Sequence, residues 1–405
     1  MTTENIKTFN FIQKNHLNKS LIKKKLKDFE KSIKETKEEI NRTDKTLNVL
    51  NTQYKLNFKI KDLKKFDNFK TVVIIGMGGS ILGAEAIYNF LSKKIKKKFY
   101  FFDNIDPEKN FFLKKKLKFK DVLFIIISKS GNTVETLANL TSLNILKRNS
   151  NNIIIITEKK NNPLFLIAKK FNLFYVEHRQ NIGGRYSVLS EVGIIPSYLM
   201  GLNIANLRLN TLKYLSSKKK LFLKDSVLKL LSLFKFKKIN NIVFINYVPD
   251  LEKFLFWCQQ LIGESLGKKG KGFLPIISQA PKDHHSLLQL YLDGPKDKLF
   301  HIFSIDDKKV KKIRANYPLK KNHFLNKKSL GEIKTAQKNA LLETFKRKNI
   351  PFREFKIKNA DEILIGELFS YFILETILVA KMSKIDPYNQ PGVEQVKILT
   401  KKFLS

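Results

Sequence analysis

The chain has 405 residues, 43% of them hydrophobic, and a formal net charge of +41. This length exceeds one ordinary domain, so it predicts two cores with room for terminal extensions. The single cysteine, Cys258, excludes an intramolecular disulfide, and its apolar neighbours indicate an inert packed thiol.

The positive charge by itself would suggest a nucleic-acid or anionic-surface partner. The lysines, however, are dispersed between predicted elements and accompany abundant Asn, Ile and Phe. That combination indicates biased coding, so we expect no specific nucleic-acid partner. The positive field would still help to capture a dianionic substrate.

No segment of the sequence suits secretion or membrane anchoring. Lys and Asn interrupt the apolar stretches near the N-terminus, and the longest apolar segment, 368–380, is broken by Glu375 and is too short to span a bilayer. The sequence therefore predicts a soluble, cytoplasmic protein with no membrane partner.

The first predicted element is an amphipathic helix over residues 17–41, whose apolar positions mostly lie three or four apart. From residue 71 the pattern changes to short β-branched and aromatic runs separated by helical segments. Apolar runs without a polar face are typical of a buried parallel sheet wrapped by helices. A second block of this kind begins near residue 240. The predicted strands are 72–75, 99–102, 122–127, 153–156 and 173–176, then 242–246, 299–305 and 352–357.

These blocks predict an α/β protein with two α/β units in tandem. We place an N-terminal helical extension at 1–60, a first domain at 61–205, a second domain at 206–382 and a helical tail at 383–405. Further helices are expected after Asp250, over 332–347 and over 362–382, and the segment 211–238 is predicted to be a helical connection.

A glycine-rich turn, Gly76 to Gly83, follows the first strand of the first unit and opens a helix. Asp103 ends the second strand, which is typical of a dinucleotide site. The third glycine of that fingerprint, however, would fall at Ile81. A sugar or phosphate contact therefore fits this turn better, with a purely structural turn and a dinucleotide site as alternatives.

The run Ser128-Lys129-Ser130-Gly131-Asn132-Thr133 directly follows the third strand, and the next residues begin a helix. Free backbone N–H groups and the positive end of the helix dipole face outward there, beside three hydroxyls. An ordinary Ser/Thr helix cap would explain one hydroxyl, but not three together with a lysine. In the common doubly wound order this loop and the glycine turn meet at one crevice. We therefore predict a phosphate site.

Two further motifs supply a cation and a carboxylate. Gly183 and Gly184 would let the backbone run close to a ligand while Arg185 points inward, although a surface turn with a solvated Arg is the alternative. Glu264 falls late in a helix with an apolar face, a place where most Glu side chains are simply exposed. A phosphate holder, a fixed cation and a carboxylate together can move a proton beside the carbonyl of a phosphorylated sugar.

That chemistry requires neither a metal nor a redox cofactor, and we predict none. His284 and His285 are adjacent, so their side chains diverge and make a poor metal pair. The segment 389–397 is predicted to be a turn entering a short helix.

In this order, the motifs 76–83, 128–136, 183–187, 263–265, His285 and 390–397 closely resemble the glucose-6-phosphate isomerase family, over about residues 70–400. The resemblance implies two sugar-isomerase domains of flavodoxin-like topology, a homodimer, and interconversion of glucose 6-phosphate and fructose 6-phosphate. It also implies roles for the site residues. The phosphate is held by Ser128, Lys129, Ser130 and Thr133, and the sugar lies beside Gly79, Ser80 and Gln390. Glu264 carries the proton, Arg185 stabilises the enediolate, and His285 of the partner subunit serves ring opening with Lys397.

Three other functions compete with this one. A sugar-phosphate-binding regulator would normally add a helix-turn-helix unit, and the first 60 residues show no paired short helices around a glycine turn. Glucosamine-6-phosphate synthesis would need an N-terminal nucleophilic Cys, and the only Cys is at 258. A bifunctional phosphoglucose/phosphomannose isomerase stays open because both reactions share one enediol. The presence of His284 beside His285 also leaves open which of them opens the ring.

Overall fold

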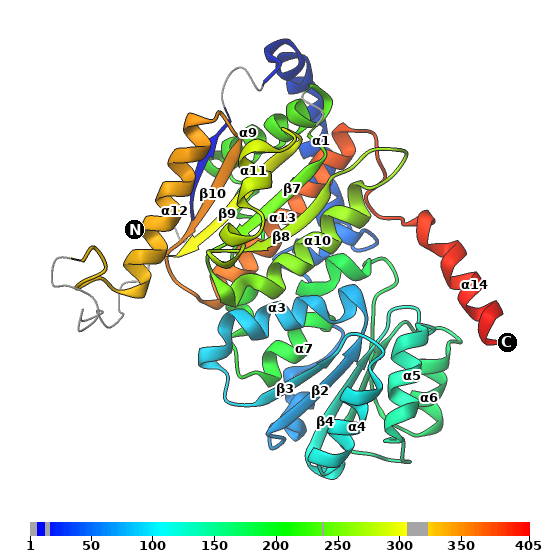
Figure 1. The fold of residues 1–405 in the computed structure, drawn as a ribbon. Helices are drawn as coiled ribbons and strands as arrows, with labels where there is room; N and C mark the ends of the chain where they lie inside the picture. Colours follow the sequence, from blue (N-terminus) through cyan, green and yellow to red (C-terminus); the bar gives the residue numbers. More distant parts are fainter. Residues whose placement is uncertain (1–5, 13–16, 237–238, 306–322) are drawn as a thin grey trace.

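The structure is a computed structural model that describes residues 6–12, 17–236, 239–305 and 323–405. It contains two separate five-stranded sheets, each covered by helices, and the second sheet lies above the first in the view of Figure 1. Nine of the ten strands named in these sheets join parallel neighbours. The predicted α/β class with two tandem parallel sheets is therefore confirmed.

The first sheet has the strand order β3-β2-β4-β5-β6, and every pairing is parallel. Numbered from its own first strand, this is the flavodoxin-like order 2-1-3-4-5, with its switch point between β2 and β4. Buried faces on both sides explain the continuous apolar runs, because all six residues of β4 are buried. The strands are β2 (Thr71–Gly76), β3 (Lys98–Phe102), β4 (Val122–Ile127), β5 (Ile153–Thr157) and β6 (Phe174–Glu177); the helices are α3 (Leu82–Leu91), α4 (Pro107–Lys116), α5 (Val134–Leu143) and α6 (Pro163–Lys170).

The second sheet has the order β1-β10-β9-β7-β8, in which only β1 is antiparallel, with Ile6 opposite Ile357. Its four parallel strands lie in the order β8-β7-β9-β10. If β7 is counted as strand 1, this is the order 2-1-3-4, as in the first sheet. The strands are β1 (Ile6–Phe11), β7 (Asn241–Asn246), β8 (Leu274–Gln279), β9 (Lys298–Ile305) and β10 (Phe352–Ile357); the helices are α10 (Glu252–Leu266), α11 (Leu288–Asp293), α12 (Leu330–Arg347) and α13 (Glu362–Met382).

The two edge strands β1 and β8 were not predicted. β8 contains Pro275, which lacks a backbone N–H and is tolerated mainly at a sheet edge. β1 is a short strand in the segment 1–60, which was predicted to be helical. The N-terminal extension is therefore not only helical, because it adds a strand to the sheet of the second half of the chain.

Helices from both halves share one continuous apolar core, which runs from the first sheet through α3 and α10 to the second sheet. α13 lies at its centre: it is apolar and long enough to cross a membrane, yet 94% of its apolar window is buried inside the molecule. α1 (Lys19–Asn41), α8 (Ile204–Arg208) and α9 (Ser217–Phe236) pack against it, and α7 (Glu191–Leu199) packs against α3 in the same core. The expected helices over 17–41 and 211–238 correspond to α1 and to α9.

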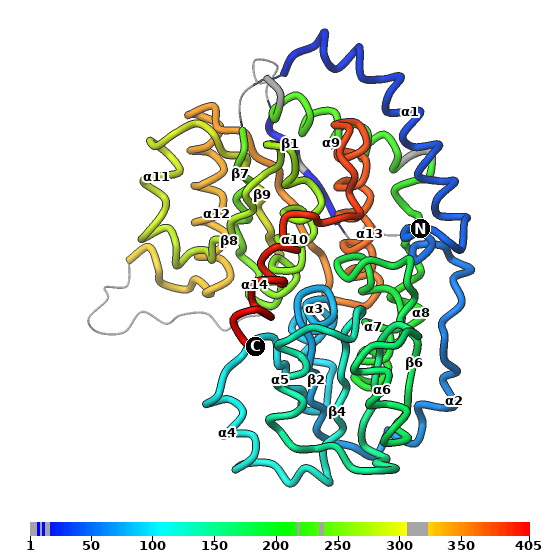
Figure 2. Tube along the Cα trace, turned by 90° about the vertical axis from the view of Figure 1, so that its right-hand side faces the viewer, coloured from blue at the N-terminus to red at the C-terminus, as the bar shows by residue number. Residues whose placement is uncertain are grey.

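The last helix, α14 (Glu394–Leu404), has no buried residue. It projects away from the rest of the chain in Figure 1, and in Figure 2 it lies in front of the other elements. The segment before it is held firmly, because Pro387 and Asn389 accept hydrogen bonds from Arg185. The predicted C-terminal tail is thus anchored up to residue 390 and exposed beyond it.

Candidate active site

The predicted phosphate loop, Ser128 to Thr133, connects β4 to α5 at the switch point of the first sheet. Ser128 Oγ lies 2.9 Å from Thr133 Oγ1 and accepts a hydrogen bond from the Gly131 N–H at 3.1 Å. Gly131 has a φ of +66°, and a Cβ there would lie 1.8 Å from Asn162 Oδ1, so the tight loop requires glycine.

The loop leaves the start of α5 open. Thr133 is the N-cap residue, but its side chain makes no capping hydrogen bond. The first N–H groups of α5 are therefore not capped by this side chain, and an anion at this point would be favoured by the helix dipole. The simple helix-cap interpretation of this motif does not describe the observed geometry.

The glycine turn and the Gly183-Gly184-Arg185 segment pack directly against each other. A Cβ at Gly79 would lie 2.1 Å from the carbonyl carbon of Gly184 and 2.5 Å from the backbone nitrogen of Arg185. The Ser187 hydroxyl donates to the carbonyl oxygen of Gly184 at 2.7 Å and lies 3.3 Å from that of Gly79, and Ser80 is buried in the same turn. Only glycine at position 79 lets the two loops approach this closely.

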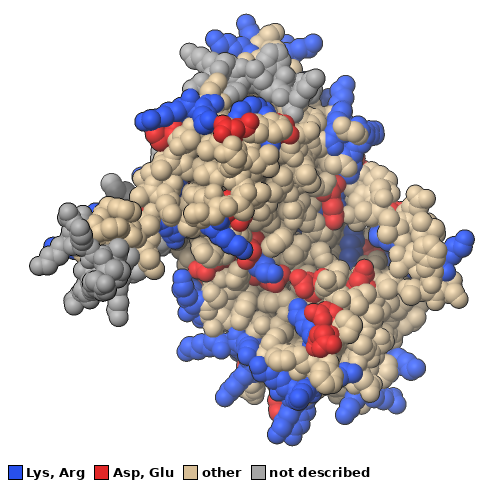
Figure 3. All heavy atoms as spheres, viewed as in Figure 1, with Lys and Arg blue, Asp and Glu red and all other residues tan. Residues whose placement is uncertain are grey.

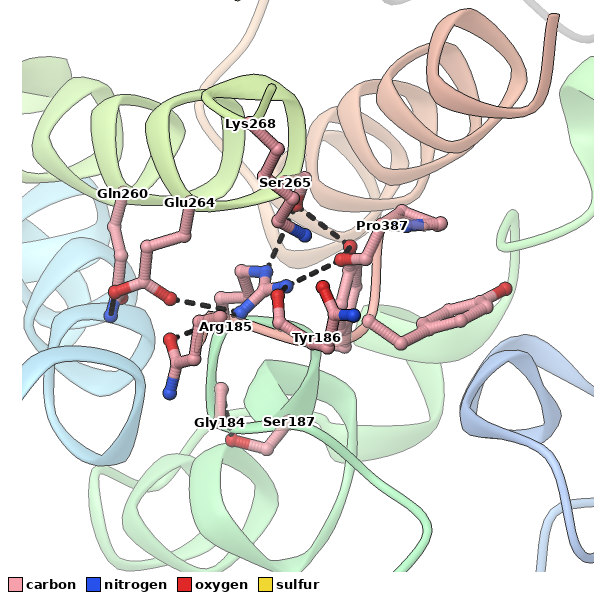
Figure 4. Close-up of polar contacts among 12 residues, drawn as sticks. Gly184, Arg185, Tyr186, Ser187, Gln260, Glu264, Ser265, Lys268 and Pro387 are labelled. Atoms are coloured by element: carbon pink, nitrogen blue, oxygen red, sulfur yellow. Dashed lines mark hydrogen bonds and ion pairs between the residues drawn. The ribbon is translucent and has the colours of Figure 1, made fainter. Parts of the chain in front are cut away.

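Arg185 is the centre of the site, and Figure 4 shows its contacts. The side chain is only 3% exposed. Nη1 lies 2.9 Å from Glu264 Oε2 and 3.4 Å from Gln390 Oε1, while Nη2 donates to the backbone oxygens of Pro387 and Asn389. Its Nε donates to Ser265 Oγ at 2.9 Å. Every nitrogen of this guanidinium therefore has a partner, which fixes the cation in one orientation.

A short chain of hydroxyls supports the guanidinium from behind. Ser265 Oγ lies 2.8 Å from Tyr186 Oη, and Tyr186 Oη donates to the Pro387 oxygen at 2.8 Å. Because Tyr186 has one hydroxyl proton and gives it to Pro387, the Ser265 hydroxyl must donate to Tyr186 while accepting from Arg185. Burial raises the pKa of Tyr186, so this donor stays protonated.

Glu264 lies on α10 and faces Arg185 with one oxygen. Its other oxygen, Oε1, accepts from Gln260 Nε2 at 2.9 Å, one helical turn earlier on the same helix. The carboxylate is 31% exposed, whereas its cationic partner is buried. A carboxylate held at both oxygens and open on one side can take a proton from a bound molecule.

Two lysines add positive charge around this pair. The pKa of Lys129 is lowered, chiefly by burial and further by the charges of Lys160 and Arg185, while Glu158 at 3.8 Å opposes the shift. Burial and the charge of Arg185 likewise lower the pKa of Lys268. Arg185 is thus close enough to influence the phosphate loop electrostatically, and both lysines would gain from a bound anion.

The structure brings some of the predicted residues together and leaves others apart. Arg185 contacts both Glu264 and Gln390, and Gly79 lies against the Arg185 backbone. Lys397 lies on the projecting helix α14, where its ammonium pairs with Glu394 at 2.7 Å. His285 is exposed in a short 3₁₀ turn after β8, and the structure gives it no contact with Arg185 or Glu264.

The neighbouring histidine is engaged elsewhere. His284 Nε2 lies 2.7 Å from the Tyr247 hydroxyl and is partly buried. Burial and the adjacent His285 lower the pKa of His284. Of the two histidines, His285 is the more exposed.

Three residues that shape the site were not predicted from the sequence: Gln260, Ser265 and Tyr186. Gln260 could have been found, because it stands four residues before Glu264 on a predicted helix and therefore on the same face. Ser265 and Tyr186 belong to the motifs 263–265 and 183–187, but the sequence predicts no function for either residue. Their function follows from the hydrogen bond between their hydroxyls, which joins segments 79 residues apart. A local sequence pattern does not predict such a contact.

Within residues 6–12, 17–236, 239–305 and 323–405, no group of three or more His, Cys, Asp or Glu side chains is placed to hold a metal ion. The groups that the structure does assemble are a fixed guanidinium, a carboxylate and a phosphate loop. These are the kinds of group that binding a phosphorylated molecule and moving a proton within it require.

Comparisons with known proteins identify the family of the chain. The model of the phosphoglucose isomerase family matches residues 32–405. A probable glucose-6-phosphate isomerase of Methanococcus maripaludis is 32% identical over 377 residues, which cover 89% of this chain and 84% of that protein. A glucose-6-phosphate isomerase of Methanocaldococcus jannaschii is 34% identical over 347 residues, covering 82% and 84%.

Solved structures agree on the fold. A hypothetical protein from Thermus thermophilus superposes with a TM-score of 0.80 at 23% identity, covering 95% of this chain and 97% of that one. A glucose-6-phosphate isomerase from Chlamydia trachomatis superposes with a TM-score of 0.78 at 17% identity, covering 100% and 89%. Fold and site together define a sugar isomerase of the α/β class. The chain belongs to the phosphoglucose isomerase family.

Proposed function

We propose that this chain is an enzyme that interconverts glucose 6-phosphate and fructose 6-phosphate through a cis-enediol intermediate, as a step of glycolysis and gluconeogenesis. The observation that carries the proposal is the contact of 2.9 Å between the buried Arg185 and Glu264, set beside a phosphate loop whose helix start is open. Relatives of similar length that are named glucose-6-phosphate isomerases support it.

The phosphate group of the sugar is held by the loop. Ser128, Ser130 and Thr133 provide hydroxyls, Lys129 provides a charge, and the first N–H groups of α5 provide the helix dipole. Hydrogen bonds to a charged group are worth about 1.5–3 kcal/mol each. Binding at this distant group fixes the sugar chain so that its first carbons reach the proton-transfer residues.

Proton transfer is the task of Glu264. Its carboxylate takes the proton from C2 of the open-chain aldose and returns it to C1, while the hydroxyl proton of O2 passes to O1, so that the aldose becomes the ketose. Negative charge develops on the oxygens of the enediol during this transfer, and the fixed guanidinium of Arg185 stabilises it. Gln260 keeps the carboxylate pointing to the same place before and after the transfer.

We place Gln390 and Gly79 with Ser80 along the sugar. Gln390 is exposed and touches Arg185, whereas Gly79 brings the glycine turn against the Arg185 backbone. Both therefore border the region between the phosphate loop and Glu264 that the carbon chain would occupy.

Ring opening is assigned to His285 of a second subunit, together with Lys397. His285 is exposed and forms no hydrogen bond with a side chain in the described part of the molecule, whereas His284 is bonded to Tyr247. The apolar residues of α14 are also exposed, since Val396, Ile398, Phe403 and Leu404 are each more than 60% accessible. We therefore propose a homodimer whose active sites combine residues from both chains. We also propose that the enzyme is soluble and cytoplasmic.

The activity is tested by incubating the purified protein with fructose 6-phosphate in deuterium oxide and resolving the hexose 6-phosphates. Glucose 6-phosphate that carries deuterium at C2 in part of the molecules is expected, because a proton on Glu264 can exchange with solvent during the enediol stage. A mannose 6-phosphate product would add the phosphomannose activity. Saturable binding without any isomerised product would instead identify a sugar-phosphate-binding regulator.

The shared site is tested by subunit mixing. Chains with Glu264→Gln and chains with His285→Ala, each nearly inactive alone, are co-refolded. Random pairing makes about half of the dimers mixed, each with one intact site, so activity should approach about a quarter of that of the unmodified enzyme. His284→Ala serves as the matched control for His285→Ala. Mixed dimers without any recovered activity would place His285 outside the shared site.

A further inference from the structure

The lysines of the first domain are distributed unevenly in space, although they are dispersed along the sequence. Between residues 93 and 120 there are eleven lysines and only three acidic residues. The three acidic residues, Asp103, Asp106 and Glu108, follow β3 and begin α4, at the end of the sheet that carries the phosphate loop. Most of the lysines lie at the other end.

The strand register shows this arrangement. Thr71, the first residue of β2, pairs with Lys98 of β3 on one side and with Val122 of β4 on the other. Lys96 precedes β3, and Lys118 and Lys120 precede β4, so all of them lie beside the amino ends of the three strands. α4 runs back towards this end and finishes at Lys116.

We call this set the basic rim: Lys96, Lys98, Lys115, Lys116, Lys118 and Lys120. All six side chains are exposed. In Figure 3, Lys and Arg side chains gather at the foot of the view, over the first domain, while Asp and Glu lie mostly along the middle. The fold has thus collected, at one edge, charges that are scattered along the sequence.

The rim lysines differ from their sequence neighbours in having no acidic partner. Lys93 pairs with Asp250, Lys94 with Glu362, and Lys109 with Asp103. In the part of the chain that the structure describes, none of the six rim lysines forms an ion pair. Asp67 and Asp121 lie at the same end of the sheet and offset part of this positive charge. The remaining like charges repel each other, and an anionic partner would remove that repulsion.

Exposed aromatic rings lie beside these charges. Phe111 is 64% exposed and Phe112 is 49% exposed, both on α4, and the Lys116 ammonium lies 4.7 Å from the centroid of the Phe112 ring. Two consecutive helical residues point about 100° apart, and the next residue, Leu113, is buried. The rings therefore do not form the continuous apolar stripe that insertion into a lipid surface requires.

We propose that the basic rim binds single-stranded RNA, with the lysines on the phosphates and Phe111 and Phe112 stacked on bases. Lysines interleaved with exposed aromatic rings are the arrangement that recognises single strands without a preferred sequence. The rim lies at the end of the sheet opposite the phosphate loop, so this binding is separate from the isomerase reaction and does not depend on it.

The test compares two variants with the same change in net charge. In the rim variant all six rim lysines become Gln. In the control variant Lys19, Lys23, Lys24, Lys27, Lys31 and Lys34, which are exposed on α1, become Gln. Binding of a fluorescein-labelled oligouridylate of about 20 nucleotides is followed by fluorescence anisotropy between about 50 and 200 mM KCl. Six phosphate contacts on a single strand predict that the logarithm of the binding constant falls with the logarithm of the salt concentration with a slope of about −4.

The rim variant should lose at least about tenfold in affinity and most of this slope, whereas the control variant should lose less than about threefold. Phe111→Ala should also weaken RNA binding by several fold. Both variants should keep their isomerisation rate and their thermal melting point, which shows that they are folded. Equal losses in the rim and control variants would overturn the proposal, because the net charge of +41 would then explain the binding.

Vesicles of phosphatidylglycerol provide the second arm of the test. If the unmodified protein binds them more tightly than the RNA, and if the rim variant loses that binding, the rim is a membrane-docking surface and the RNA proposal is wrong. Retention of RNA binding by the rim variant would overturn it as well.

Discussion

Replacing Glu264 by Gln should abolish most of the turnover while leaving the fold intact. The structure accommodates the new amide well. Gln260 Oε1 is buried without a hydrogen-bond partner, so the Gln260 amide can rotate and accept from the amide group introduced at position 264. The side-chain oxygen that remains at this position then still accepts from Arg185, in place of the carboxylate oxygen 2.9 Å away. What is lost is the negative charge and the ability to take a proton.

The expected loss in kcat is about 10²- to 10⁴-fold, which corresponds to about 2.7–5.5 kcal/mol of activation free energy. The melting temperature should fall by only about 3 °C, because one charge-assisted hydrogen bond becomes a neutral one. A coupled assay of fructose 6-phosphate turnover measures the first quantity, and circular dichroism measures the second.

The matched control is Glu252→Gln, which removes a negative charge from the first turn of the same helix without touching Arg185. It should keep turnover within about twofold, since the loss is confined to a charge–dipole interaction of about 0.3–1 kcal/mol. If Glu264→Gln retains near-normal turnover, the base is a different residue. If it unfolds, the amide rearrangement inferred for Gln260 is wrong.

Three further changes test other parts of the structure. Gly79→Ala should lower kcat/KM by about 100-fold or more, because its Cβ would lie 2.1 Å from Gly184 and must displace the Arg185 backbone; unchanged kinetics would mean that this contact is not needed. Ser130→Ala combined with Thr133→Ala should raise KM at least about tenfold, since two hydrogen bonds to the phosphate are removed, and calorimetry with sorbitol 6-phosphate should show the same weakening. Burial lowers the pKa of His178 from 6.5 to about 4. As the pH drops from 6.5 to 4, the imidazole is protonated in the unfolded chain before it is protonated in the folded one. The free energy of unfolding should therefore fall by roughly 3 kcal/mol over this range. In His178→Gln this part of the pH dependence should disappear from urea unfolding curves, and its persistence would assign it to other groups.

The sequence was sufficient for much of the first sheet and for the phosphate loop, because both depend on local order along the chain. Continuous β-branched runs must be buried on both faces, and a Ser/Thr-rich loop between a strand and a helix opens at the helix start. The edge strands of the second sheet, β1 and β8, were not predicted, although β3 and β6 at the edges of the first sheet were. Pro275 in β8 breaks the expected pattern, and β1 becomes a strand only because β10 is available as an antiparallel neighbour.

What the sequence determined by itself is the set of reactive groups: a phosphate loop, an arginine after two glycines and a glutamate late in a helix. Their meeting was decided by tertiary structure. Arg185 and Glu264 are 79 residues apart, and Pro387 is a further 123 residues along the chain; only the packing of both sheets around one core brings them into direct contact. The same holds for the charges, since the register of β2, β3 and β4 gathers lysines from separate loops at one edge. Side-chain chemistry is local, but distance in space is set by the whole fold.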